Sequence, residues 1–111
     1  MEDDVRAKIL ESAAGLRYEV VKAVSDTVRI QSVSPEFGWK SAENVDGETK
    51  VNRYMREVMA EAGLSTDLFA AVDGRHNLVG VCKGKGGGKS LLFNGHVDVV
   101  PPGETPWEDG D

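Results

Sequence analysis

The stretch from Ser90 to Gly103, which reads SLLFNGHVDVVPPG, constrains the fold of this chain more than any other part of it. Its first half is dense in Leu, Phe and Val, and residues of these types at such density favour a buried β-strand. Pro101 and Pro102 cannot continue a paired strand, because each lacks an N–H and has a fixed φ angle. The sequence therefore predicts a buried strand that ends near Val100.

Three polar residues interrupt this apolar run at alternate positions. Asn94, His96 and Asp98 are two residues apart, so a strand places all three side chains on one face. The opposite face is then entirely apolar and carries Leu91, Phe93, Val97 and Val99. In open α/β sheets, ligands bind beyond the carboxyl ends of the strands. Both the position and the chemistry of His96 and Asp98 therefore predict a functional site.

The His-x-Asp spacing suits metal binding, but it also suits a simpler arrangement. A neutral imidazole is a common zinc ligand, so His96 is a candidate ligand. Asp98 is either a second ligand or the acceptor that fixes the tautomer of a ligating histidine. A plain hydrogen bond between His96 and Asp98, with no metal, has the same spacing. A zinc site needs three or four protein ligands, so two residues leave these alternatives open.

The longer string from Phe93 to Pro101, FNGHVDVVP, resembles the first metal-site motif of the acetylornithine deacetylase/succinyl-diaminopimelate desuccinylase family. This family of co-catalytic zinc hydrolases also includes aminoacylases and carboxypeptidase G-type enzymes. The segments 30–35 (IQSVSP) and 77–81 (NLVGV) are similar to the family as well, and Trp107 matches a tryptophan often found after the motif. The resemblance implies an α/β fold, namely the N-terminal portion of a zinc-exopeptidase-like mixed-sheet domain with two helices, a hairpin and a third strand.

The resemblance also implies roles for individual residues. His96 would be a ligand of the first metal, and Asp98 would be the catalytic residue that orients His96 and tunes the nucleophile. The complete enzyme would hold two Zn2+ ions, with Co2+ or Mn2+ as alternatives, would cleave a small N-acyl amino acid or peptide substrate, and could form a homodimer. The remaining ligands, the general base and the lid or dimerisation domain would lie downstream. We therefore expect residues 1–111 to be a fragment of the catalytic domain with no useful hydrolase activity alone.

Composition excludes several other classes of protein. Hydrophobic residues make up 40% of the chain and charged residues 29%, which is ordinary for a soluble globular protein. The 13 basic and 19 acidic residues give a net charge of −6 without a basic cluster, which argues against a nucleic-acid partner. No segment approaches the roughly 18–20 apolar residues that span a bilayer, and the N-terminus is acidic where a signal peptide is basic. We predict a cytoplasmic protein with neither a nucleic-acid nor a membrane partner.

Cys82 is the only cysteine and lies within an apolar run. A single cysteine cannot form an internal disulfide, which suits a reducing cytosol. We expect Cys82 to be a small buried strand residue rather than a reactive thiol.

Two helices are predicted from apolar residues that recur every three or four positions. The first extends from Glu2 to about Arg29, with Gly15 as a weak point where it can break. The second follows Asp46, a candidate N-cap, and closes at Gly63.

A β-hairpin is predicted after the second helix. Strands at 66–71 and 77–83 flank a turn at Asp73 and Gly74, and His76 is expected to be a surface residue in or beside this turn. The glycine-rich segment 84–90 fails as a phosphate-binding loop, because Lys83 occupies the position of the first required glycine. A strand is also expected after it where such a loop needs a helix, so we predict a flexible hairpin turn.

An alternative function from another class remains open. The chain could be a non-catalytic α/β module that binds a partner through an open sheet edge, with the His96–Asp98 pair serving only a structural role. A downstream Asp, a Glu–Glu pair and a late His would favour the enzyme over this module.

Overall fold

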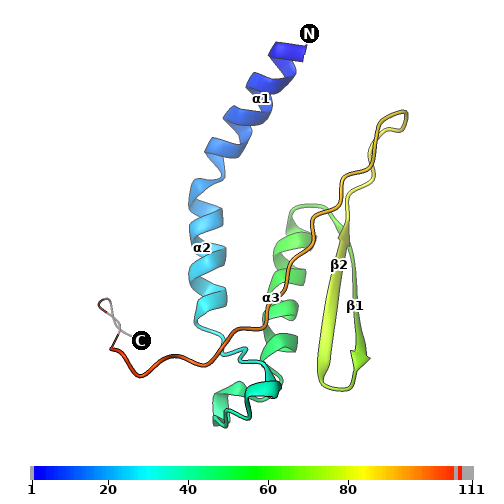
Figure 1. Ribbon diagram of the computed structural model, residues 1–111. Coiled ribbons are helices and arrows are strands. Elements are labelled where there is room, and N and C mark those ends of the chain that lie inside the picture. Colours follow the sequence, from blue (N-terminus) through cyan, green and yellow to red (C-terminus); the bar gives the residue numbers. More distant parts are fainter. Residues whose placement is uncertain (1, 107, 109–111) are drawn as a thin grey trace.

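A long bent helical arm, a helix packed on a β-hairpin, and an extended C-terminal segment make up the chain in the computed structural model (Figure 1). The structure describes residues 2–106 and 108. The predicted mixed α/β class is confirmed by three α-helices and a two-stranded antiparallel sheet within this part of the chain. The elements in order are α1 (Glu2–Gly15), α2 (Arg17–Val28), η1 (Pro35–Phe37), η2 (Ala42–Asn44), α3 (Gly47–Glu61), β1 (Ser65–Val72) and β2 (Arg75–Val81).

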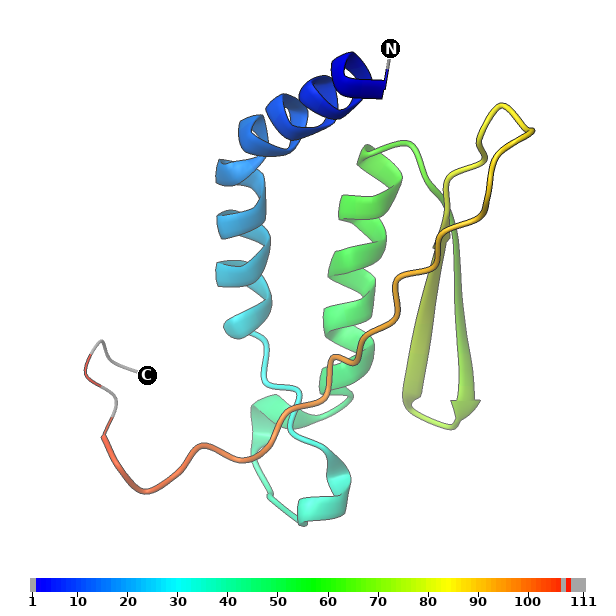
Figure 2. The ribbon, with the colours of Figure 1, turned by 45° about the horizontal axis from the view of Figure 1, so that its top comes forward.

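The helical arm consists of α1 and α2 and bends between them (Figure 2). Helix α1 ends at Gly15, and Leu16 adopts φ −90° and ψ 8° before α2 begins. The predicted helix is therefore confirmed, together with its break at Gly15. Neither helix contains a buried residue. No helix in the described residues combines the length and the apolar character needed to cross a membrane.

Helix α3 has a well-defined end and an unusual start. Asp46 occupies the predicted N-cap position, but its backbone is left-handed (φ 53°) and its side chain makes no capping hydrogen bond. At the other end, the N–H groups of Gly63 and Leu64 donate to the carbonyls of Ala60 and Met59, each at 3.0 Å. This pair of bonds is a Schellman motif, and the left-handed residue that it requires is Gly63, with φ 87°. The predicted closure at Gly63 is confirmed.

The hairpin β1–β2 forms as predicted, with ends that differ by a few residues. Its register pairs Ser65 with Val81 and Val72 with Arg75, and an irregularity lies between Ala70 and Val72. Helix α3 contacts both strands (Figure 1). Gly80 permits this packing, because a Cβ atom there would lie 2.6 Å from the sulfur of Met59.

The predicted third strand does not form. The segment 90–100 is extended, but it makes only one isolated parallel bridge, between Val33 and Val99, and does not join the sheet (Figure 2). Leu91, Leu92 and Phe93 are 78%, 84% and 87% exposed instead of buried. A high β-propensity defines a strand only where a neighbouring strand offers backbone partners. Among residues 2–106 and 108, this segment finds such partners only near Val99.

Two smaller expectations also need correction. Cys82 is exposed rather than buried, and it lies one residue beyond the end of β2, where Val81 is exposed as well. The glycine-rich segment 84–90 does reverse the chain direction, as predicted, but no paired strand follows it (Figure 1). Trp107, the tryptophan that matched the family, lies outside the described residues.

The core is small and off-centre. Val33 and Val51 are the buried hydrophobic residues among those described, and the buried polar residues are their sequence neighbours Ser32, Ser34, Thr49 and Asn52. The radius of gyration is 17.3 Å, against about 13 Å expected for a compact chain of this length. The core therefore lies where the loop after α2 meets the start of α3, and much apolar surface elsewhere is uncovered.

Candidate metal site

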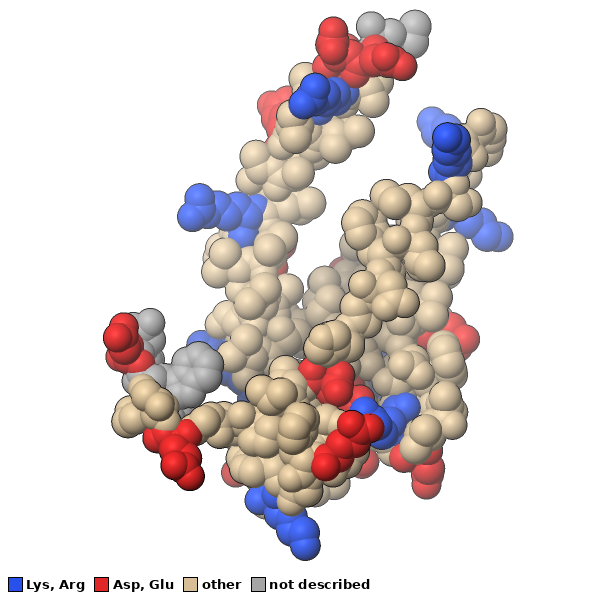
Figure 3. Space-filling model, in the orientation of Figure 1, with Lys and Arg blue, Asp and Glu red and all other residues tan. Residues whose placement is uncertain are grey.

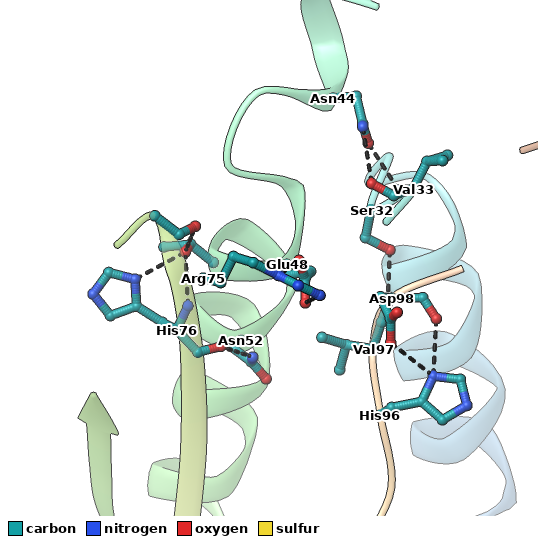
Figure 4. A network of polar contacts seen from close by, with 12 residues as sticks. Ser32, Val33, Asn44, Glu48, Asn52, Arg75, His76, His96, Val97 and Asp98 are labelled. Atoms are coloured by element: carbon teal, nitrogen blue, oxygen red, sulfur yellow. Dashed lines mark hydrogen bonds and ion pairs between the residues drawn. The ribbon is translucent and has the colours of Figure 1, made fainter. Parts of the chain in front are cut away.

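His96 and Asp98 lie side by side on the extended segment (Figure 4). The His96 Nδ1 atom is 3.0 Å from Asp98 Oδ1 and 2.9 Å from the backbone carbonyl oxygen of Asp98. The His96 side chain is 83% exposed, whereas that of Asp98 is 34% exposed. The two side chains therefore turn toward each other, and solvent reaches the rest of the imidazole ring.

The partners of Nδ1 determine what the other ring nitrogen can do. A carboxylate oxygen and a carbonyl oxygen can only accept, so Nδ1 must carry a proton to bond to either of them. In the neutral ring, the lone pair then lies on Nε2, for which the described residues provide no hydrogen-bond donor. This arrangement, with one ring nitrogen donating to a carboxylate and the other free, is typical of metal-binding histidines.

The second histidine has a different environment. His76 is the second residue of β2 and lies beside the turn, as predicted, but it is half-buried and not at the surface. Its Nδ1 atom is 2.9 Å from Thr49 Oγ1, and its backbone carbonyl accepts a 2.7 Å hydrogen bond from Asn52 Nδ2. Figure 4 shows that His76 sits against α3, whereas His96 lies on the separate extended segment. The two histidines therefore do not form a joint site.

The described residues supply only part of a metal site. No group of three or more His, Cys, Asp and Glu side chains within residues 2–106 and 108 is placed to hold a metal ion. Zinc needs three or four protein ligands. His96 fits one ligand position, with Asp98 in the place of its orienting carboxylate, and further ligands would have to come from elsewhere.

A bidentate ion pair joins the hairpin turn to the start of α3. Arg75 Nε lies 2.6 Å from Glu48 Oε2, and Arg75 Nη2 lies 3.0 Å from Glu48 Oε1. The hydrogen bond and the charge of Glu48 raise the pKa of Arg75, and the carboxylates of Asp98 and Glu36 add smaller contributions. The ion pair with Glu48 thus holds the Arg75 side chain against the start of α3.

The residues that hold the extended segment 90–100 in place were not predicted from the sequence. Ser32 and Ser34 bond to Val97 and Val99, and the side chain of Asn44 bonds to Val33. Ser32 and Ser34 lie in segment 30–35, which is similar to the deacetylase family. That similarity does not indicate what the two serines contact.

The charged surface near the site has no single sign. Figure 3 shows acidic and basic side chains interspersed on the lower part of the face drawn there, with basic side chains near the glycine-rich loop and acidic ones at the N-terminal end of α1. This face therefore offers no extended field of one charge.

Comparison with known proteins indicates a relationship to deacylating hydrolases. One relative is the acetylornithine deacetylase of Vibrio atlanticus (strain LGP32), which is 32% identical to this chain over 90 residues. The aligned part is 80% of this chain but 21% of the Vibrio protein, so the chain spans about a fifth of the length of that relative. No family model matches the chain, and no solved structure matches it significantly. The similarity supports a hydrolase relationship and does not define the reaction.

Proposed function

We propose that this chain is the N-terminal part of a metal-dependent amide hydrolase that removes the acyl group from an N-acyl amino acid or a small peptide-like amide. The observation that carries the proposal is the pairing of His96 Nδ1 with Asp98, which leaves Nε2 open to solvent. The similarity to an acetylornithine deacetylase supports the same chemistry.

In this proposal, His96 holds a metal ion through Nε2. Asp98 keeps the proton on Nδ1, fixes the orientation of the ring and raises its basicity as a ligand. When bound, the metal (Zn2+, or Co2+ or Mn2+ in its place) polarises the amide carbonyl and lowers the pKa of a water molecule. The other ligands, the second metal site and the general base come from residues beyond those of this chain.

The exposed apolar surface supports the view that residues 1–111 are one portion of a larger catalytic domain. Leu91, Leu92 and Phe93 are exposed on an extended segment, and this part of the segment pairs with no strand among the described residues. Contiguous exposed apolar surface usually marks an interaction face. We propose that the rest of the domain supplies the missing strand and covers these residues, and that the complete enzyme can form a homodimer.

The alternative, a non-catalytic module, depends only on open sheet edges. Strands β1 and β2 pair with each other and have no other neighbour in the described chain. Any isolated hairpin has such edges, and the similarity to a deacetylase gives the module no support. The hydrolase is therefore the better proposal.

A chimera tests the proposal. The part of the Vibrio deacetylase that aligns with this chain is replaced by the corresponding residues of this chain, and metal-dependent release of acetate from acetylornithine is measured. We expect hydrolysis in the chimera, a loss of about 10–100-fold for Asp98→Asn and a larger loss for His96→Ala.

The matched control is His76→Ala, which removes a histidine from the same chain but away from the site. It should retain metal-dependent activity once circular dichroism shows that it is folded. A folded chimera that hydrolyses acetylornithine equally well with His96→Ala, or not at all with His96 intact, would contradict the proposal.

A further inference from the structure

The segment that carries His96 and Asp98 is attached to the body of the protein at one short place. Residues 32–34 and 97–99 lie parallel, although they are far apart in the sequence. The Val99 N–H donates to the Ser32 carbonyl, and the Ser34 N–H donates to the Val99 carbonyl, both at 3.0 Å. Within the described residues, every hydrogen bond from segment 82–106 to the rest of the chain ends on Ser32 or Ser34.

A side chain adds a third hydrogen bond to this attachment. The hydroxyl of Ser32, a residue only 4% exposed, donates to the Val97 carbonyl at 2.7 Å. Val97 lies between His96 and Asp98, and Val99 follows Asp98. The backbone is therefore held immediately before and immediately after Asp98 (Figure 4).

This attachment affects the orientation of the His96 imidazole ring. His96 Nδ1 contacts both the Oδ1 atom and the backbone carbonyl of Asp98. A rotation of the peptide groups around Asp98 would separate the ring from the carbonyl and redirect the carboxylate. Bonds that fix Val97 and Val99 therefore also fix the ring orientation and the tautomer of His96.

The side chain of Asn44 bonds to the edge of residues 32–34 that faces away from segment 97–99. Its Oδ1 atom accepts a 2.8 Å hydrogen bond from the Val33 N–H, and its Nδ2 atom donates to the Val33 carbonyl at 3.0 Å. A neighbouring strand would make the same two bonds, so the Asn44 amide replaces a strand at this edge. Val33 is 6% exposed, which means that water cannot easily take the place of Asn44.

We infer that Ser32 and Asn44 are positioning residues, which act through the backbone of residues 97–99 to set the His96–Asp98 geometry before any metal binds. Ser32 holds the peptide between the two site residues, and Asn44 keeps residues 32–34 in the extended conformation that receives segment 97–99. The inference rests on the proposed function where it assigns these residues a part in catalysis. The His96–Asp98 geometry itself does not depend on a metal.

The test is Ser32→Ala, compared with Ser65→Ala in the full chain. Ser65 is a matched control because its hydroxyl also donates to a valine carbonyl, that of Val81 at 3.3 Å, but it lies on the hairpin. Hydrogen exchange and the ring 15N chemical shifts of His96 are measured by NMR without metal. We expect Ser32→Ala to speed exchange of the Val99 amide about fivefold, since one hydrogen bond is lost, and to lower the fraction of His96 protonated at Nδ1.

The amide exchange rates of the β1–β2 hairpin distinguish a local positioning role of Ser32 from a general loss of stability. These rates should be unchanged in Ser32→Ala. Ser65→Ala should change neither the exchange of the Val99 amide nor the tautomer of His96. Equal acceleration throughout the chain, or an unchanged His96 tautomer, would overturn the inference.

Asn44→Asp is the second variant, with Asn77→Asp, at an exposed position on the hairpin, as its control. An aspartate at position 44 cannot donate to the Val33 carbonyl, so the same shift of the His96 tautomer is expected there and not at position 77. An unchanged tautomer in Asn44→Asp would contradict the role of Asn44. Because these measurements use no metal, they can fail while metal binding at His96 succeeds, and the reverse also holds.

Discussion

Gly47 lies against the backbone of Gln31 so closely that a Cβ atom at position 47 would be 2.0 Å from the Gln31 carbonyl oxygen. The same atom would lie 2.8 Å from the Cα of Ser32. The first residue of α3 therefore packs directly on the loop that receives the His96 segment. Both neighbours are backbone atoms, which cannot turn away as a side chain can.

Gly47→Ala should therefore destabilise the protein, by roughly 2–3 kcal/mol, because the start of α3 must move away from the loop. The measurement is urea denaturation followed by circular dichroism. Gly15→Ala is the matched control, because nothing lies within 4 Å of a Cβ at that position. It should leave stability equal or raise it by up to about 1 kcal/mol, since alanine is the better helix residue. Equal effects of the two substitutions would contradict the close approach at Gly47.

The contact between α2 and α3 should depend on pH. Asp26 accepts hydrogen bonds from the ammonium group of Lys22 and, at 2.8 Å, from the hydroxyl of Tyr54, and these bonds lower the pKa of Asp26. Because the pKa is lower in the folded than in the unfolded chain, this carboxylate stabilises the fold above the ordinary aspartate pKa of about 3.9. The contribution is lost as the pH falls through the folded-state pKa.

Asp26→Asn should thus be less stable than the wild type near neutral pH, and the two should converge in acid. Urea denaturation at several pH values between neutrality and strong acid measures the difference. A stability difference that stays constant over this whole range would show that the Asp26 charge does not stabilise the contact.

Lysine at position 75 should not replace arginine in the ion pair with Glu48 without a loss of stability. Arg75→Lys removes the second of two parallel N–H···O bonds, because an ammonium group lacks the planar fork of arginine. We expect a lower midpoint of urea denaturation for Arg75→Lys, and a smaller added effect when Glu48→Gln is already present. Arg53→Lys is the control, since Arg53 is exposed on α3 and makes no ion pair with the described residues. Additive effects of the Arg75 and Glu48 substitutions would contradict the coupling.

Local patterns in the sequence were sufficient to predict α3 and the hairpin. The helical spacing before Gly63 and the Asp73–Gly74 turn each act over a few residues, so no distant partner was needed to read them. The period-two placement of His96 and Asp98 likewise predicted that their side chains lie on the same side, and the structure shows them in contact.

Features that depend on distant partners could not be predicted in this way. Segment 90–100 has the composition of a buried strand, yet whether it pairs depends on a neighbour that composition does not reveal. The bonds of Ser32 and Asn44 depend on how the loop folds back on itself and on the extended segment. Serine and asparagine are common in loops for many reasons, so neither stood out before the structure placed it.

NMR of the histidine rings shows most directly whether the free Nε2 atom of His96 is a metal ligand, as we propose. Zn2+ is added near neutral pH to the chimera described above, in which the rest of the Vibrio deacetylase stands in for the residues beyond this chain, and the ring 15N shifts of His96 and His76 are followed. We expect that the His96 Nε2 resonance moves on binding, that His76 does not respond, and that His96→Ala abolishes the effect. A Zn2+ response centred on His76, or none at His96, would contradict the proposal.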